Sequence, residues 1–232
     1  MAELVLALDL PRQDAALAMA RAVRGQVTWC KVGMELFTQA GPAMLAELKD
    51  MGFRVFLDLK FYDIPHTVGR AVAVCARMGV DLLTLHCQGG ERMCREAVTA
   101  ANSTEGATGR PMLFGVTALT SFSAGEMPGI SQNPGDFALE LARGAAHWGL
   151  TGVVCSGEEV AAIKKTVPGL ACLCPGIRLP DAAGDDQRRI MTPGRAVALG
   201  ADYLVVGRPI LQAADPVAVC GRILQDMNSA GR

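Results

Sequence analysis

Short apolar runs alternate with helix-like segments along the chain, and this alternation restricts the fold more than any other feature of the sequence. The runs indicate buried strands at residues 4–9, 27–33, 54–60, 82–86, 112–119, 152–155, 171–174 and 203–207. Segments between them carry apolar residues at helical spacing, for example at 13–24, 42–52, 67–79 and 137–149. Strands that are apolar almost throughout and alternate with helices indicate a parallel sheet that is covered by helices.

Eight strand-then-helix repeats favour a closed barrel over an open sheet. The chain has 232 residues, and no linker or low-complexity stretch divides it. We therefore predict a single-domain α/β protein, a (β/α)8 TIM barrel over residues 1–232, since such barrels form single domains of roughly 200–250 residues. The alternative is an open, doubly wound sheet, but the first strand–helix turn, LDLPRQD, has no glycine-rich dinucleotide motif.

Composition excludes several classes of protein. The 22 Lys and Arg nearly balance the 23 Asp and Glu, whereas nucleic-acid-binding domains usually carry a basic surface. The hydrophobic share of 50% excludes intrinsic disorder, yet no run reaches the ~18 apolar residues of a membrane helix. From the first residues, MAELVLALDLPRQD, we expect no secretion signal. We therefore expect a cytoplasmic protein that binds neither nucleic acid nor membrane, with its eight cysteines reduced in the core.

Charged residues lie where buried strands should be apolar, near the C-terminal ends of the first three strands. Asp9 closes the first strand, Lys31 comes late in the second, Asp58 and Lys60 end the third, and Asp63 follows in the turn. Asp58 and Lys60 are two residues apart, so strand alternation points both to the same side. Neighbouring strand ends converge at the mouth of a barrel, where barrel enzymes have their active sites. Because unpaired buried charges are costly, a polar site explains this set better than a structural ion-pair network.

A second group of residues follows the last two strands and suits a phosphate group. Gly207 and Arg208 come directly after the eighth strand, where many barrels bind phosphate. Glycine lets the backbone approach an anion, and arginine offers a planar fork of donors. Arg178 and Gln187 lie in the long loop at 175–190, which can fold over the same anion.

Metal and hydrolase sites are not indicated. The three histidines, at positions 66, 86 and 147, lack the spacing of metal ligands, and Ser156 does not lie in a nucleophile-elbow motif. His86 ends the fourth strand, where packing beside the site explains it better than catalysis. We therefore expect no metal.

Six segments resemble the orotidine 5′-phosphate decarboxylase family, in that family's order. The strongest is FLDLKFYDIPHTV with its D-x-K-x-x-D core; the others are LALDL, WCKVGMELF, GVTALTS, PGIR…DDQRRIMTP and ADYLVVGRPI. The resemblance covers essentially the whole chain. It implies a barrel enzyme that converts orotidine 5′-monophosphate to UMP and CO2, the last step of de novo UMP synthesis, without a metal or organic cofactor.

The resemblance also implies roles for individual residues. Asp58 and Lys60 would face the scissile carboxylate, with Lys60 protonating C6 after CO2 leaves. Asp9 and Lys31 would hold ribose hydroxyls, and Lys31 would also join the charged network.

The remaining residues would contact the substrate elsewhere. Those that would reach a partner's site across a homodimer interface are Asp63, Ile64 and Thr67. Those that would hold the phosphate are Arg178, Gly207 and Arg208. Thr120 would contact the pyrimidine, and Gln187 would bridge base and phosphate.

Two alternatives remain open. One is a Mg2+-dependent sugar-phosphate decarboxylase or aldolase of the same barrel superfamily, such as 3-keto-L-gulonate 6-phosphate decarboxylase or hexulose phosphate synthase. Those enzymes resemble this chain in scaffold but carry an acidic residue where it has Lys31. The other is a non-catalytic nucleotide-binding barrel, which would keep the arginines and lose the set of Asp58, Lys60 and Asp63. This chain retains both groups.

Overall fold

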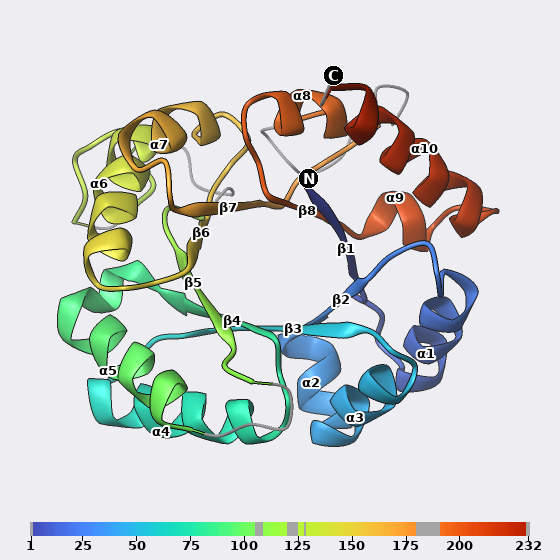
Figure 1. Cartoon of the computed structure of the whole chain (residues 1–232), viewed down its shortest axis with the longest axis horizontal. Coiled ribbons are helices and arrows are strands. Elements are labelled where there is room, and N and C mark those ends of the chain that lie inside the picture. The colour runs from blue at the N-terminus through green and yellow to red at the C-terminus, as the bar shows by residue number, and fades with distance from the viewer. Residues whose placement is uncertain (1, 105–108, 120–124, 128, 180–190, 231–232) are drawn as a thin grey trace.

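The chain folds into a closed barrel of eight parallel strands with helices around the outside (Figure 1), which confirms the predicted (β/α)8 TIM barrel. The computed structural model describes residues 2–104, 109–119, 125–127, 129–179 and 191–230. Each strand pairs with its neighbour in the sequence, and β8 pairs with β1 to close the ring. The strands are β1 (Glu3–Ala7), β2 (Trp29–Gly33), β3 (Arg54–Phe61), β4 (Leu82–His86), β5 (Met112–Val116), β6 (Gly152–Val154), β7 (Ala171–Cys174) and β8 (Tyr203–Val206).

The helices form the outer layer and return the chain from the C-terminal end of one strand to the N-terminal end of the next. A proline lies in the first turn of α3, α4, α6 and α8, where its fixed φ suits a helix start and its missing N–H is not needed. The helices are α1 (Gln13–Ala22), α2 (Met34–Ala40), α3 (Pro42–Asp50), α4 (Pro65–Arg77), the 3-10 helix η1 (Cys87–Gly89), α5 (Gly90–Ser103), α6 (Pro134–His147), α7 (Val160–Thr166), α8 (Pro193–Ala198), α9 (Arg208–Leu211) and α10 (Pro216–Ala230).

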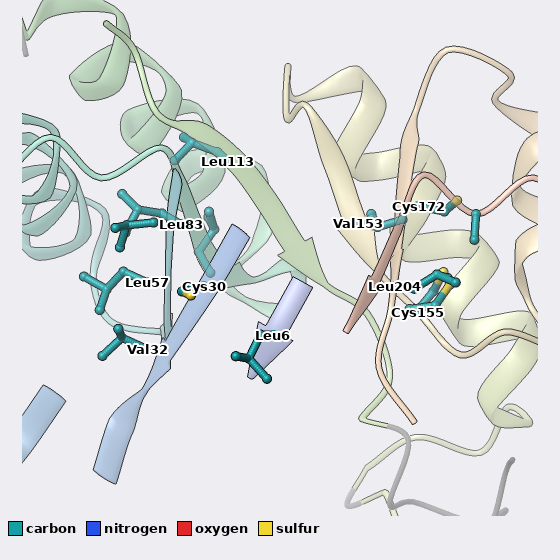
Figure 2. Packing of buried hydrophobic residues seen from close by; sticks show 14 of the residues in the cluster. Leu6, Cys30, Val32, Leu57, Leu83, Leu113, Val153, Cys155, Cys172 and Leu204 are labelled. Carbon is teal, nitrogen blue, oxygen red and sulfur yellow. The ribbon is translucent and has the colours of Figure 1, made fainter. Parts of the chain in front are cut away.

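Strand side chains alternate between two hydrophobic layers, as expected from strand geometry. The outer layer packs the strands against the helices, and Figure 2 shows part of it, with Leu57, Leu83 and Leu113 side by side on three consecutive strands. The inner layer fills the barrel and consists of Val5, Ala7, Trp29, Phe56, Leu82, Phe114, Leu173 and Val205.

An aromatic group fills the N-terminal end of the barrel. Trp29 donates its indole N–H to Glu3 Oε2 at 2.7 Å and meets the ring of Tyr203 edge-on at 5.7 Å. The guanidinium of Arg54 lies over the Trp29 ring, 4.3 Å from its centroid. This packing leaves the opposite, C-terminal end of the barrel for a ligand.

The strand ends differ slightly from the expectations. Asp9 lies two residues beyond the end of β1, and Lys31 occupies the middle of β2. All eight cysteines are buried and free, which confirms the prediction of reduced thiols in the core. Among the residues that the structure describes, no helix is long and apolar enough to cross a membrane.

Candidate active site

A cavity of about 460 Å³ opens at the C-terminal ends of the strands. Its size suits a small-molecule ligand. Its floor is apolar and comes from the inner layer of the barrel, with Phe56, Leu173 and Val205 among its lining residues. The charged residues that line it are Asp9, Lys31, Asp58, Lys60, Arg178 and Arg208. An apolar floor with a few convergent polar groups is typical of a ligand-binding site.

Four of these charged side chains form a row of alternating sign across the ends of β1, β2 and β3. Lys31 Nζ lies 2.8 Å from Asp9 Oδ1 and 3.6 Å from Asp58 Oδ2. Lys60 Nζ donates to both carboxylate oxygens of Asp58 at 2.9 Å. The side chains of Lys31, Asp58 and Lys60 are 9%, 13% and 26% exposed, whereas that of Asp9 is 56% exposed. The structure therefore brings together the four charged residues that the sequence placed at these strand ends.

The electrostatic surroundings keep Asp58 ionised. Burial raises the pKa of Asp58, but the nearby charges of Lys31 and Lys60 outweigh it, and hydrogen bonds from Lys60 and Thr84 act in the same direction, so the net pKa is below the usual value. Burial, followed by the charge of Lys60, lowers the pKa of His86 at the end of β4. At neutral pH the site therefore combines an anionic carboxylate with a neutral imidazole.

The strand that carries Asp58 and Lys60 is irregular at that point. The register between β3 and β4 shifts between Leu57 and Phe61. Lys60 has φ of 51°, and among the described residues it alone combines a positive φ with a side chain. Simple alternation, which the sequence suggested, does not therefore explain why the two side chains meet. They meet across a distorted segment of β3.

Two arginines line the cavity from β7 and β8, and β7 lies opposite β3 in the eight-strand ring. Arg178 follows β7, is buried, and donates from Nη1 to the carbonyl of Ile177 at 2.9 Å. Arg208 begins α9 directly after Gly207, which itself lines the cavity. A Cβ added at Gly207 would lie 3.4 Å from that of Ala7, so glycine keeps this segment close to β1. The charged row thus follows β1, β2 and β3, Arg178 lines the cavity after the opposite strand β7, and Arg208 follows β8, which pairs with β1 at the Asp9 end of the row.

Three of the predicted site residues lie outside the cavity of this chain. Asp63, Ile64 and Thr67 are exposed, in the turn after β3 and the first turns of α4, and none of them lines the cavity. Asp63 accepts a hydrogen bond from the backbone N–H of Ile64 at 2.6 Å. Two further predicted residues, Thr120 and Gln187, lie outside the described residues.

Sequence reasoning missed two residues that contact the charged row. A Cβ added at Gly33 would lie 3.0 Å from Lys31 Nζ and 3.1 Å from Asp9 Oδ1, so a side chain there would press on both groups. Thr84 is buried on β4 and hydrogen-bonds to Asp58 and to the backbone of Lys60. A hydroxyl within the apolar run LLTLH was the available signal for Thr84.

Metal binding finds no support in the part of the chain that the structure describes. No group of three or more His, Cys, Asp or Glu residues there is arranged to hold a metal ion. The ammonium of Lys31 lies between the carboxylates of Asp9 and Asp58 and pairs with both.

Comparison with known proteins points to one family. A family model described as "Orotidine 5'-phosphate decarboxylase / HUMPS family" matches residues 2–223. A protein named orotidine 5'-phosphate decarboxylase from Nitratidesulfovibrio vulgaris (strain DP4) is 54% identical over 235 residues, covering 100% of both chains. One of the same name from Pseudomonas aeruginosa (strain LESB58) is 44% identical over 229 residues, covering 97% of both. The crystal structure of orotidine 5'-phosphate decarboxylase from Lactobacillus acidophilus matches with a TM-score of 0.87 at 32% identity, covering 98% of this chain and 100% of that one.

Proposed function

This chain belongs to the orotidine 5'-phosphate decarboxylase / HUMPS family, and we propose that it converts orotidine 5′-monophosphate to UMP and CO2, the last step of pyrimidine nucleotide synthesis. The observation that carries the proposal is the pairing of Lys60 with Asp58 inside the cavity, with Lys31 on the other side of the same carboxylate. This arrangement supplies a proton donor, and its positive charges would stabilise a carbanion without a cofactor that accepts the electron pair.

The groups that line the cavity suit the different parts of this substrate. Arg178, Gly207 and Arg208 would bind the phosphate, since arginine forks and exposed backbone N–H groups suit phosphate oxygens. Asp9 and Lys31 would bind ribose hydroxyls. The pyrimidine would then lie over the apolar floor, with its C6 carboxylate towards the charged row. We further propose that Thr120 contacts the pyrimidine and that Gln187 bridges the base and the phosphate.

The chemistry requires stabilisation of negative charge at C6. When the C6–CO2 bond breaks, its electron pair stays on C6 as a vinyl carbanion, and no adjacent carbonyl delocalises it. Many decarboxylases use a cofactor as the electron sink. Here the Lys60 ammonium would stabilise the developing charge and transfer its proton to C6, giving UMP and a neutral amine that regains a proton from water.

Asp58 would act on the substrate before the bond breaks. Its carboxylate and the substrate carboxylate, about 4 Å apart at an effective dielectric constant near 20, repel by up to ~4 kcal/mol. This repulsion disappears as neutral CO2 leaves, so it lowers the barrier to bond cleavage. Asp58 also holds Lys60 through two hydrogen bonds of 2.9 Å, so it orients the proton donor as well.

Lys31 favours this reaction over the Mg2+-dependent alternative. Its ammonium takes the place between Asp9 and Asp58 that a cation would need. A divalent ion bound there would meet a fixed positive charge instead of a third oxygen ligand.

We also propose a cytoplasmic homodimer in which the sites are shared. Asp63 and Thr67 are exposed beside the cavity-forming strand β3 and would enter the partner's cavity. Large exposed apolar side chains adjoin Asp63 in the sequence, at Tyr62 and Ile64. Burying this apolar surface would stabilise such an interface.

The test is the loss of orotidine 5′-monophosphate absorbance in the ultraviolet, followed with purified protein in the presence and absence of EDTA. The proposal predicts turnover that EDTA does not change and that Lys60→Ala abolishes. Mg2+-dependent turnover of a sugar phosphate, with no turnover of the nucleotide, would support the alternative enzyme. Binding of UMP without any turnover would support a non-catalytic nucleotide-binding barrel.

A further inference from the structure

β3 contains extra residues at the point where it presents Asp58 and Lys60. Between the pairs Leu57–Leu83 and Phe61–Leu85, β3 advances by four residues while β4 advances by two, so β3 has two more residues than its partner. A bulge of this kind interrupts the backbone ladder and redirects side chains, and it often occurs beside active sites. The ladder therefore does not hold the backbone of Lys60 in the usual way.

The bulge also places Lys60 in an unfavourable conformation. Its φ of 51° lies in the left-handed region, which strains a residue that carries a Cβ. Such a conformation persists only when neighbouring groups fix it. The backbone N–H of Lys60, removed from the ladder, also needs a hydrogen-bond acceptor.

The Thr84 hydroxyl meets both requirements. Thr84 Oγ1 accepts a hydrogen bond from the backbone N–H of Lys60 at 3.0 Å and donates one to Asp58 Oδ1 at 2.9 Å. A hydroxyl has one donor and two acceptor positions, so it makes both bonds at once. Thr84 is fully buried, two residues after the inward-facing Leu82 on β4, so its side chain points into the barrel.

The two bonds act on the two groups that the proposed reaction uses. The bond to Lys60 fixes the backbone from which the ammonium extends, and the bond to Asp58 fixes the rotation of the carboxylate. Lys60 Nζ in turn lies 2.9 Å from both oxygens of that carboxylate. A single hydroxyl thus connects the bulge, the carboxylate and the ammonium into one rigid unit.

We propose that Thr84 is a positioning residue, whose hydroxyl holds the β3 bulge and orients Asp58 so that Lys60 is directed at the reacting carbon. The inference rests on the proposed decarboxylase function. Thr84 acts only through Asp58 and Lys60 and does not line the cavity. Its removal is therefore expected to slow the chemical step without weakening the contacts made by the phosphate end.

The test compares two variants. Thr84→Val keeps the shape of the side chain and removes the hydroxyl, whereas Thr84→Ser keeps the hydroxyl and removes a methyl group. Each is assayed for decarboxylation of orotidine 5′-monophosphate, and UMP binding is measured by calorimetry. We expect Thr84→Val to lower kcat by about 100-fold, as a misplaced reacting group does, with UMP affinity close to wild type. Thr84→Ser should retain most of the wild-type kcat.

A crystal structure of Thr84→Val gives a readout that does not depend on turnover. The proposal predicts that Lys60 leaves its positive φ or that the Asp58 carboxylate turns away from Lys60. A wild-type kcat in Thr84→Val, an equal loss in Thr84→Ser, or a matching loss of UMP affinity would overturn the proposal. If the wild-type protein does not decarboxylate the nucleotide, the proposed function fails. An unchanged bulge and an unchanged Asp58–Lys60 pair in the variant structure would then still overturn the role of Thr84.

Discussion

Replacing Asp58 by asparagine is expected to destabilise the fold at neutral pH, because it removes a negative charge that lies between two largely buried ammonium groups. The carboxylate is 2.9 Å from Lys60 Nζ and 3.6 Å from Lys31 Nζ. At an effective dielectric constant near 20, each attraction is worth about 5 kcal/mol. The cost of burying the charges offsets part of this, and removing one partner of a buried pair costs about 3–5 kcal/mol. For a domain of this size, that loss lowers Tm by roughly 6–20 °C.

The direction of the pKa shift of Asp58 determines how this loss of stability should vary with pH. The folded-state pKa of Asp58 lies below the usual value, despite the opposing effect of burial. Its ionised form therefore stabilises the fold above the unfolded-state pKa of about 3.9, and this contribution is lost as the pH falls through the lower pKa of the folded state. The difference in the free energy of unfolding between the wild type and Asp58→Asn should be largest at pH 7 and should become smaller towards acid pH.

Urea unfolding followed by circular dichroism, at pH 7 and at a series of lower pH values, measures this difference. Asp14→Asn is the matched control, because Asp14 pairs with Arg12 on an exposed surface and its loss should hardly change stability. Equal stability of Asp58→Asn and wild type at pH 7, or a difference that does not vary with pH, would refute the reasoning.

Three further substitutions test the proposed roles of the site. Lys60→Ala should abolish decarboxylation while UMP binding, measured by calorimetry, persists; substantial turnover would remove Lys60 as the proton donor. Arg208→Ala should raise KM strongly in steady-state assays, because the phosphate loses a charged donor, and an unchanged KM would contradict that assignment. Gly33→Ala should lower kcat/KM, since its Cβ would lie 3.0 Å from Lys31 Nζ. Wild-type kinetics in that variant would show that Lys31 can move without consequence.

The barrel was predictable because each of its strands is buried on both faces. A strand that packs against helices on one side and fills the barrel on the other is apolar at almost every position, as in β6 or β8. The convergence of Asp9, Lys31 and Asp58 followed from the same architecture, since the C-terminal ends of consecutive strands meet at one mouth. Short helices such as α2 and α9 were not predicted, because one or two turns do not establish a helical period.

The bulge in β3 could not be predicted, because it is a property of pairing and not of the segment itself. Residues 54–60 have the composition of a regular strand, and the shift exists only relative to the register of β4. The contact of Thr84 with both Asp58 and Lys60 depends on that register. Local sequence therefore placed Asp58 and Lys60 at the candidate site but did not reveal Thr84, which contacts both of them.

The energetics of the proposed reaction require binding contacts away from the reacting end, and the two arginines follow β7, opposite β3, and β8, three strands from β3 in the ring. A substrate carboxylate placed beside Asp58 meets repulsion, and the attraction of Lys60 is already shared with Asp58 itself. Favourable contacts at the reacting end therefore cannot supply the binding energy. Contacts that do not change during the reaction would have to supply it, and we propose that Arg178 and Arg208 make such contacts with the phosphate. In the proposed mechanism, binding at the phosphate end would hold the substrate carboxylate against Asp58, and departure of CO2 would relieve the repulsion while the phosphate contacts stay in place.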